Sequence, residues 1–234
     1  MPVQQDRARR TRTAIVRSAA REFDRNGYTA TSVDTILEGS GVTKGAFYFH
    51  FPSKELLAVA IVEAMHVRWA PAVRHWAETD CDALQVVLGL VDEMTVHSTT
   101  DALVRAGLRL TTEQELAGAG LLAPYPEWER IFRHLFQRAQ LTGLLRPRVR
   151  PATAAHVLVA AIVGERDLSG PTTDPDELRA RTDELLGVLI PAFACEHWVA
   201  QWEASDWSER SLPPVAAGWG EPDTEDGPTA DHQR

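Results

Sequence analysis

The sequence predicts an all-α protein made of a small N-terminal domain and a larger C-terminal domain. Apolar residues recur every three to four positions through most of the chain, which is the spacing of one face of an α-helix. The charge is uneven: residues 1–60 carry nine basic and six acidic side chains, a net charge of +3, in a chain of net charge −9. A cationic end on an acidic body indicates that only this end meets phosphate groups.

Length and composition set the domain plan. A chain of 234 residues with 44% hydrophobic content is long enough for two helical cores. We expect a three-helix domain over residues 1–52 and a larger helical domain over residues 53–204. Beyond Trp207 the composition shifts to Pro, Gly, Ala and acidic residues without apolar periodicity, so we expect a disordered acidic tail over residues 205–234.

The first helix is expected over residues 9–26, where Ile15, Ala19 and Phe23 form an apolar stripe. Gly27 follows it, and glycine adopts the left-handed backbone conformation that commonly ends a helix. Several arginines, among them Arg10, precede or enter this helix. They favour contact with phosphate, although an arginine-rich terminus alone is often a solvated tail.

Two short helices come next. Ser32 is placed to cap a helix over residues 33–38, which the glycine-containing segment 39–41 ends. Thr43 is placed to cap a second helix, and Pro52 with Ser53 ends it and caps the one that follows. Two short helices joined by a glycine-containing turn predict a helix-turn-helix, whose second helix enters the major groove of DNA.

Polar residues of this segment are candidates for DNA contact. Lys44 is placed for a guanine edge or a phosphate, and Tyr48, His50 and Lys54 are placed for the DNA backbone. The alternative is an aromatic-rich packing helix with solvated lysines. Phe47 and Phe51 are expected to pack inward in either case.

The run from Gly41 to Glu55 resembles, almost residue for residue, the recognition segment of TetR-family transcriptional repressors. The resemblance implies a DNA-binding protein that is not an enzyme. With it, the expected DNA-contacting residues are Arg10, Ser32, Thr43, Lys44, Gly45, Tyr48, His50 and Lys54.

The remaining chain reads as successive amphipathic helices. They are expected over residues 53–69, ending before Pro71, then 82–97, a helix capped by Asp101, 127–141 closed by Gly143, 151–166 and 174–195. Gly118, Gly120, Pro124 and Pro126 mark the loop before residue 127.

The last two helices carry surplus apolar surface, including Leu158 and Leu186. A helix that is apolar nearly all round, as residues 151–166 are, must be buried on several sides. These helices therefore predict either a homodimer interface or the core of a monomer. The helix-turn-helix favours the dimer, because two copies read a pseudo-palindromic double-stranded operator.

Three further runs, at residues 103–110, 124–128 and 159–164, look like those of the γ-butyrolactone receptor branch of the TetR family. The resemblance implies a repressor of antibiotic-biosynthesis genes that leaves DNA on binding a lactone, butenolide or furan signal. It also implies that Trp128 lies in the ligand pocket and that Met65 stands where the branch commonly has glutamine. The expected ligand-contacting residues are Met65, Val87, Leu88, Leu110, Trp128 and Val163.

Two alternatives stay open at this point. Trp128 is a core aromatic if there is no pocket, with its indole N–H bonded to a carbonyl. The protein is also readable as a pseudo-receptor that answers to other ligands, such as antibiotics, or to none; Met65 favours this alternative.

Other classes of function find little support. The histidines are scattered, and the sequence has no metal-binding HExxH motif, P-loop, nucleophile elbow or dinucleotide fingerprint, so we expect no cofactor and no metal. Cys81 and Cys195 fit no metal or redox spacing. No run of 18 apolar residues and no signal peptide is present, so we expect no membrane association and a cytoplasmic location.

Overall fold

The structure is a computed structural model, and it describes residues 2–116, 118–119, 123–170 and 174–205. Within these residues the chain forms ten α-helices, a short 3₁₀ helix at Gln114–Leu116 and an isolated antiparallel bridge between Leu145 and Ala194. The helices are α1 Pro2–Ala30, α2 Val33–Ser40, α3 Lys44–His50, α4 Lys54–Ala77, α5 Ala83–Thr100, α6 Ala102–Leu110, α7 Tyr125–Leu141, α8 Pro151–Ser169, α9 Pro175–Phe193 and α10 Glu196–Ala204. The all-α prediction is confirmed. The tail predicted over residues 205–234 lies outside the described residues except for Ser205.

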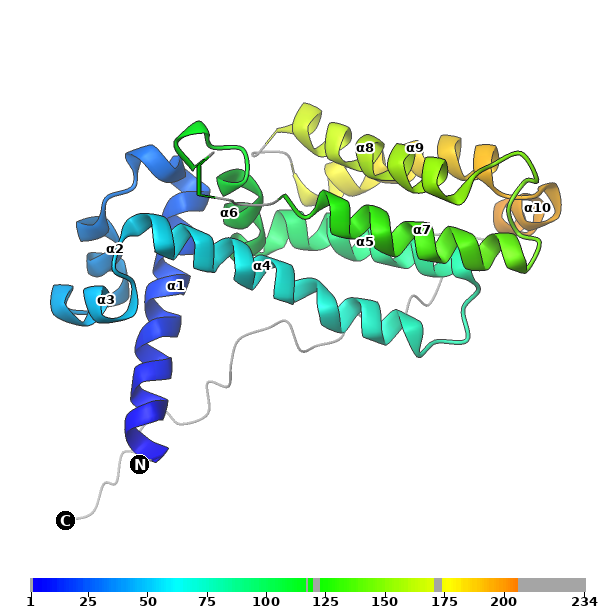
Figure 1. The fold of residues 1–234 in the computed structure, drawn as a ribbon. Helices are drawn as coiled ribbons and strands as arrows, with labels where there is room; N and C mark the ends of the chain where they lie inside the picture. Colours follow the sequence, from blue (N-terminus) through cyan, green and yellow to red (C-terminus); the bar gives the residue numbers. More distant parts are fainter. Residues whose placement is uncertain (1, 117, 120–122, 171–173, 206–234) are drawn as a thin grey trace, which may run out of the picture.

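Helices α1 to α3 gather at one end of the molecule, and the N-terminal part of α1 projects away from the rest (Figure 1). Helix α4 runs from this group along one side of the body, while α8 and α9 lie together on the opposite side (Figure 1). Helix α6 lies between α1 and the body and packs on both α1 and α4. The N-terminal helices therefore meet the body through α4 and α6.

Local sequence signals fix the ends of the first helices. Gly27, with φ of 76°, interrupts the helical backbone of α1, and Gly41, with φ of 65°, caps the C-terminus of α2. The hydroxyl of Ser32 accepts a hydrogen bond from the Thr35 amide, and that of Ser53 accepts one from the Leu56 amide. Such caps satisfy backbone N–H groups that the first helical turn leaves unpaired, so α2 and α4 each begin directly after their capping serine.

The predicted boundaries were less accurate at prolines. Helix α4 does not end before Pro71 but continues through it to Ala77. Proline removes one backbone hydrogen bond, but buried Ala72 and Trp76 hold the following turn against the core. Pro126 was predicted to lie in a loop and instead lies in the first turn of α7, where a missing N–H is tolerated.

Helix α10 was not predicted. It begins directly after α9, and its Trp198 is buried with the indole N–H donating to Asp82 Oδ2 at 2.9 Å. Trp198 and Trp202, four residues apart and stacked at 6.0 Å, were the signal in the sequence.

Helix α8 is buried on one face only. Leu158 of α8 and Leu186 of α9 are buried within the chain, so they are core residues and not part of a surplus apolar surface. The apolar side chains that remain exposed on these helices are Val157, Leu168 and Val188, the last with 73% of its surface exposed.

One helix of the described chain, α4, is long and apolar enough by length and composition to cross a membrane. Core helices of soluble proteins pass the same test, and α4 buries Leu57, Ile61, Met65 and Trp69 within this chain.

Candidate DNA-binding surface and ligand cavity

Helix α3 is oriented by its one buried residue, Phe47, which is fully enclosed by the N-terminal core. Thr43 caps the helix, its hydroxyl accepting a hydrogen bond from the Ala46 amide at 3.3 Å. With Phe47 facing inward, Lys44 and Tyr48 are exposed on the outer side of the helix. The sequence therefore predicted the capping residue, the buried aromatic and the exposed face.

Lys44 is free to change partner. Its ammonium lies 3.4 Å from Asp34 Oδ1, and both side chains are well exposed. An exposed ion pair of this kind contributes little to stability. A phosphate or a guanine edge can therefore replace Asp34 at small cost.

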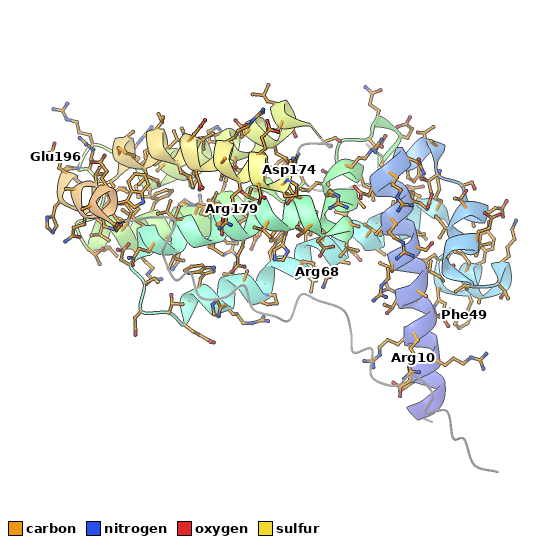
Figure 2. All side chains as sticks on the ribbon, turned by 180° about the vertical axis from the view of Figure 1, so that it is seen from behind. Arg10, Phe49, Arg68, Asp174, Arg179 and Glu196 are labelled. Atoms are coloured by element: carbon orange, nitrogen blue, oxygen red, sulfur yellow. The ribbon has the colours of Figure 1, made fainter. Side chains whose placement is uncertain are left out.

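Phe49 is an outward-facing residue that the sequence analysis missed. Its side chain is 81% exposed, and it lies at the outer edge of the three-helix unit in Figure 2. The neighbouring His50, which is half-buried, packs edge-on against it at 5.2 Å. The exposed ring follows Tyr48 on the same helix, which makes this edge a candidate contact surface.

The other predicted contacts lie around this edge. Gly45 is exposed on α3 and has open space where a Cβ would stand. Ser32 is exposed at the start of α2. Arg10 lies on the projecting part of α1, exposed and away from the body (Figure 2).

Lys54 has a different environment from the one predicted. Its ammonium donates to the carbonyl oxygens of Tyr28 at 2.8 Å and Thr31 at 2.9 Å, and it lies 4.1 Å from the centre of the Tyr28 ring. Burial lowers the pKa of Lys54 below its ordinary value. These contacts tie the start of α4 to the end of α1, so Lys54 acts within the chain.

A second set of contacts joins α6 to the same end of α1. Arg105 donates to both carboxylate oxygens of Asp24, with Nη2 to Oδ2 at 2.7 Å, and Arg109 Nη1 donates to the Asp24 carbonyl at 2.9 Å. The Tyr28 amide donates to Glu113 Oε1 at 3.1 Å. The α1–α6 joint, as we call Asp24, Gly27 and Tyr28 with Arg105, Arg109 and Glu113, links the N-terminal helices to the body.

Gly27 is favoured at this joint by its backbone conformation. Its φ of 76° suits glycine, and a Cβ at this position would lie 2.7 Å from Arg109 Nη2 and Glu113 Oε1, so these two side-chain ends would have to shift. The interruption of α1 therefore depends on this residue.

The body contains a small cavity that is partly open to solvent. Six helices contribute to its wall. The lining residues are mostly apolar and comprise Trp69, Met94, Thr95, Ser98, Leu108, Pro124, Tyr125, Trp128, Val159, Ile162, Val163, Arg166, Leu178 and Thr182. A mostly apolar cavity with a few polar groups is typical of a small-molecule site.

The sequence predicted only some of the residues that line this cavity. Trp128 and Val163 line the cavity, while Met65, Val87, Leu88 and Leu110 are core residues outside its lining. Val87 and Leu88 are on α5 but about 10 Å along the helix from Thr95, which does line it. Leu110 points to another side of α6 than Leu108, because two residues turn a helix by about 200°.

Met65 is one helical turn from the cavity. It packs directly on α6: a Cβ at Gly107 would lie 2.6 Å from Met65 Sδ. Four residues further along α4, Trp69 lines the cavity, with its ring 5.1 Å from that of Trp128 in an edge-on arrangement. The residue at position 65 therefore determines the contact of α4 with α6 and does not line the cavity.

Trp69 brings an unpaired polar group to the cavity wall. Its side chain is 6% exposed, and its indole N–H has no hydrogen-bond partner within the described part of the chain. A buried donor without a partner costs about 1–3 kcal/mol. An acceptor on a bound molecule would remove that penalty.

Comparison with known proteins agrees with this arrangement. Residues 15–61 match the family described as bacterial regulatory proteins, tetR family, and residues 81–194 match the tetracyclin repressor-like C-terminal domain. The A-factor receptor protein of Streptomyces griseus is 30% identical over 192 residues, which are 81% of this chain and 66% of that protein. This chain thus spans slightly less than two thirds of that relative.

Solved structures are similar over more of their length. A structure described as the molecular basis for control of antibiotic production by bacterial hormones is 34% identical, with a TM-score of 0.74, covering 79% of this chain and 98% of that one. A γ-butyrolactone receptor is 30% identical, with a TM-score of 0.71, covering 84% and 94%. CprB of Streptomyces coelicolor, solved in complex with its operator sequence, is 30% identical, with a TM-score of 0.70 and the same coverage.

An all-α chain with an N-terminal helix-turn-helix and a helical body that holds an apolar cavity defines a one-component regulator. The matches establish its kind: the chain belongs to the TetR family of bacterial transcriptional regulators and resembles the γ-butyrolactone receptors within it.

Proposed function

We propose that this protein is a ligand-responsive repressor in which residues 1–52 bind operator DNA and residues 53–204 bind the ligand and form a homodimer. The observation that carries the proposal is the outer face of α3, where Lys44, Tyr48 and Phe49 are exposed while Phe47 anchors the helix. This arrangement suits a recognition helix, because the side chains that reach the major groove are held by a rigid support.

The proposed DNA contacts divide into two kinds. Lys44 reads a base edge, while Tyr48, His50, Ser32, Arg10 and the amides near Thr43 and Gly45 hold the DNA backbone. Lys54 leaves this set because its ammonium is bonded to the carbonyls of Tyr28 and Thr31. Phe49 joins it as an apolar contact with the sugar–phosphate chain.

The proposed ligand is a small diffusible lactone, butenolide or furan, bound between Trp69, Trp128 and Val163. The proposed target genes direct antibiotic or other secondary metabolism, and the proposed location is the cytoplasm. The support is the cavity together with relatives named for the A-factor, for γ-butyrolactone and for control of antibiotic production.

A physical connection runs from the cavity to the N-terminal helices. Leu108 of α6 lines the cavity, and Arg105 and Arg109 of the same helix bind α1. Trp69 of α4 also lines the cavity, and Lys54 at the start of that helix binds the end of α1. A ligand that favours another position of α6 and α4 would thus shift α3 and weaken operator binding.

The proposed homodimer uses the exposed apolar residues of α8 and α9, Val157, Leu168 and Val188. Two recognition helices would then meet two half-sites of a pseudo-palindrome. The second candidate function, a repressor that answers to antibiotics or to no ligand, rests on Met65 at the position of the usual glutamine. Because Met65 lies outside the cavity lining, its identity does not separate the two candidates. They differ only in which ligand, if any, releases the protein from DNA.

One experiment tests both parts. The DNA upstream of the protein's own gene is bound to the purified protein, and lactones, butenolides, furans and antibiotics are added in turn while fluorescence anisotropy is followed. We expect one chemical class to lower operator affinity roughly 5- to 150-fold, the range of typical coupling, and Trp128→Ala to abolish that release while the free variant still binds. Failure of the free protein to bind would refute the repressor, and release only by antibiotics would favour the second candidate.

A further inference from the structure

The cavity contains a single formal charge among the described residues that line it, the guanidinium of Arg166. Arg166 lies in the last turn of α8, and its side chain is only 23% exposed. Removing a cation from water is costly unless partners replace the lost hydration. The partners of Arg166 therefore indicate what the cavity is suited to bind.

The chain itself satisfies this guanidinium from one side only. Arg166 Nη2 donates to Asp167 Oδ1 at 2.7 Å and to Tyr125 Oη at 3.2 Å, and Nε donates to Asp167 Oδ1 at 3.2 Å. No described residue accepts a hydrogen bond from Nη1. Since Tyr125 accepts from Arg166, its own hydroxyl hydrogen is available as a donor as well.

The other polar groups of the cavity wall show which hydrogen-bond donors lack an acceptor. The hydroxyls of Thr95, Ser98 and Thr182 each donate to a backbone carbonyl of their own helix, at 2.8–2.9 Å. The hydrogens without an acceptor in the described chain are those of Arg166 Nη1, the Tyr125 hydroxyl and Trp69 Nε1. A molecule that matches this wall must bring acceptors.

We propose that this cavity prefers an amphipathic ligand with an acidic group, so that within the proposed ligand classes a member whose carboxylate or acidic enolate binds Arg166 and Tyr125 is favoured over a neutral one. The apolar body of the ligand packs between Trp128 and Val163. This inference rests on the proposed function, in that it assigns the cavity as the ligand site. A guanidinium binds a carboxylate through charge-assisted hydrogen bonds, which a neutral ester or lactone cannot equal.

Recognition of an acid has to be local in this protein. The net charge of −9 repels anions at long range. Salt screens that repulsion over about 8 Å at physiological ionic strength, whereas a largely buried cation is screened much less. The acid preference should therefore depend on Arg166 and not on the overall charge.

A matched pair of probes tests the proposal on the full-length protein without DNA. Decanoate and methyl decanoate share the apolar body and differ in the charge of the head group. We expect calorimetric titration at neutral pH to show tighter binding of decanoate by roughly 10- to 100-fold, the effect of hydrogen bonds to a charged group. Arg166→Gln should remove this difference by weakening decanoate alone.

Two further variants complete the design. Arg133→Gln removes one positive charge from an exposed position of α7 outside the cavity wall, and it should keep the preference for decanoate. Arg166→Lys keeps the charge and should retain part of the preference for decanoate over methyl decanoate. It replaces Arg166→Gln in the test if that variant does not fold.

Three results would overturn the inference: equal binding of acid and ester by the unmodified protein, no binding of decanoate at millimolar concentration, or an unchanged preference in a folded Arg166 variant. Operator binding of the free protein is measured alongside. Loss of the acid preference with intact operator binding removes this inference alone, whereas an acid preference without operator binding removes the repressor proposal.

Discussion

Arg105 of α6 holds the carboxylate of Asp24 on α1 with two nitrogen atoms, and both side chains are largely shielded from solvent. Because α6 also reaches the cavity with Leu108, this ion pair lies on the helix that connects the cavity to α1. It contributes to stability, and it fixes the position of one unit relative to the other.

Arg105→Ala should uncouple the two units. We expect a loss of about 1–3 kcal/mol in the free energy of unfolding, because Asp24 keeps its partly buried charge without a partner. The ratio of operator affinity without ligand to that with ligand should fall toward one in this variant. The exposed ion pair of Arg130 with Glu127 offers the matched control, Arg130→Ala. Equal coupling in both variants would contradict the role of the joint.

Lys44→Ala should weaken operator binding by about 1–3 kcal/mol and relax the preference at one base position. Phe49→Ala should instead weaken binding to operator and scrambled duplex alike, because an apolar contact with the DNA backbone carries no sequence information. Fluorescence anisotropy on both duplexes separates the two effects. The assignment of Lys44 fails if its removal leaves affinity and base preference unchanged.

Lys54→Met should lower the stability of the N-terminal helices rather than the dependence of DNA binding on salt. The variant loses two hydrogen bonds from the ammonium to backbone carbonyls, and we expect a loss of about 1–3 kcal/mol in urea unfolding. Lys44→Met, at an exposed position, is the control for stability. If Lys54→Met instead leaves the stability unchanged and reduces by about one unit the slope of log operator affinity against log salt concentration, Lys54 contacts a DNA phosphate.

Glu93 predicts a particular pH dependence of folding. It is 3% exposed, accepts the indole N–H of Trp76 at 2.8 Å, and burial raises its pKa above the ordinary value. In the window from the ordinary pKa up to the raised one, the folded chain binds the proton and the unfolded chain does not. This group's contribution to stability is therefore lost as the pH rises through the raised pKa.

Glu93→Gln should gain stability relative to the unmodified protein as the pH goes from 5 to about 8, measured by thermal unfolding. A difference independent of pH would show that the carboxyl titrates normally.

Charge placed on the exposed residues of α8 and α9 should separate the proposed dimer. Val157→Glu with Val188→Glu should shift the mass in light scattering from twice 25.9 kDa to a single chain at micromolar concentration. Val67→Glu, at an exposed position of α4, should leave the dimer intact, because α4 runs along the side of the body opposite to α8 and α9 (Figure 1). A single-chain mass for the unmodified protein would remove the dimer.

The sequence predicted best what is local. The caps of Ser32, Thr43, Ser53 and Asp101 and the helix-ending role of Gly41 depend on residues within a few positions of one another, and the structure confirms them. Contacts between distant helices were not predictable in the same way. Lys54 was assigned to DNA because nothing in its neighbourhood reveals the carbonyls of Tyr28 and Thr31, which tertiary packing brings to it.

The cavity shows the same limit. Periodicity tells which residues of a helix are buried but not whether they face the core or a cavity. Val87 and Trp69 both occupy buried helix positions, yet only Trp69 lines the cavity. Trp128 was found through resemblance, while Arg166 was overlooked because a charged residue near a helix end is ordinarily solvated. Only the placement of Tyr125 beside it shows that its side chain turns inward.

The contact between Met65 and Gly107 makes two positions on different helices share one volume. Neither residue can grow unless the other shrinks, so the two are exchangeable only as a pair. A change of side-chain volume at position 65 would thus alter the spacing of two helices that both hold the end of α1, and with it the resting position of α1 before any ligand arrives.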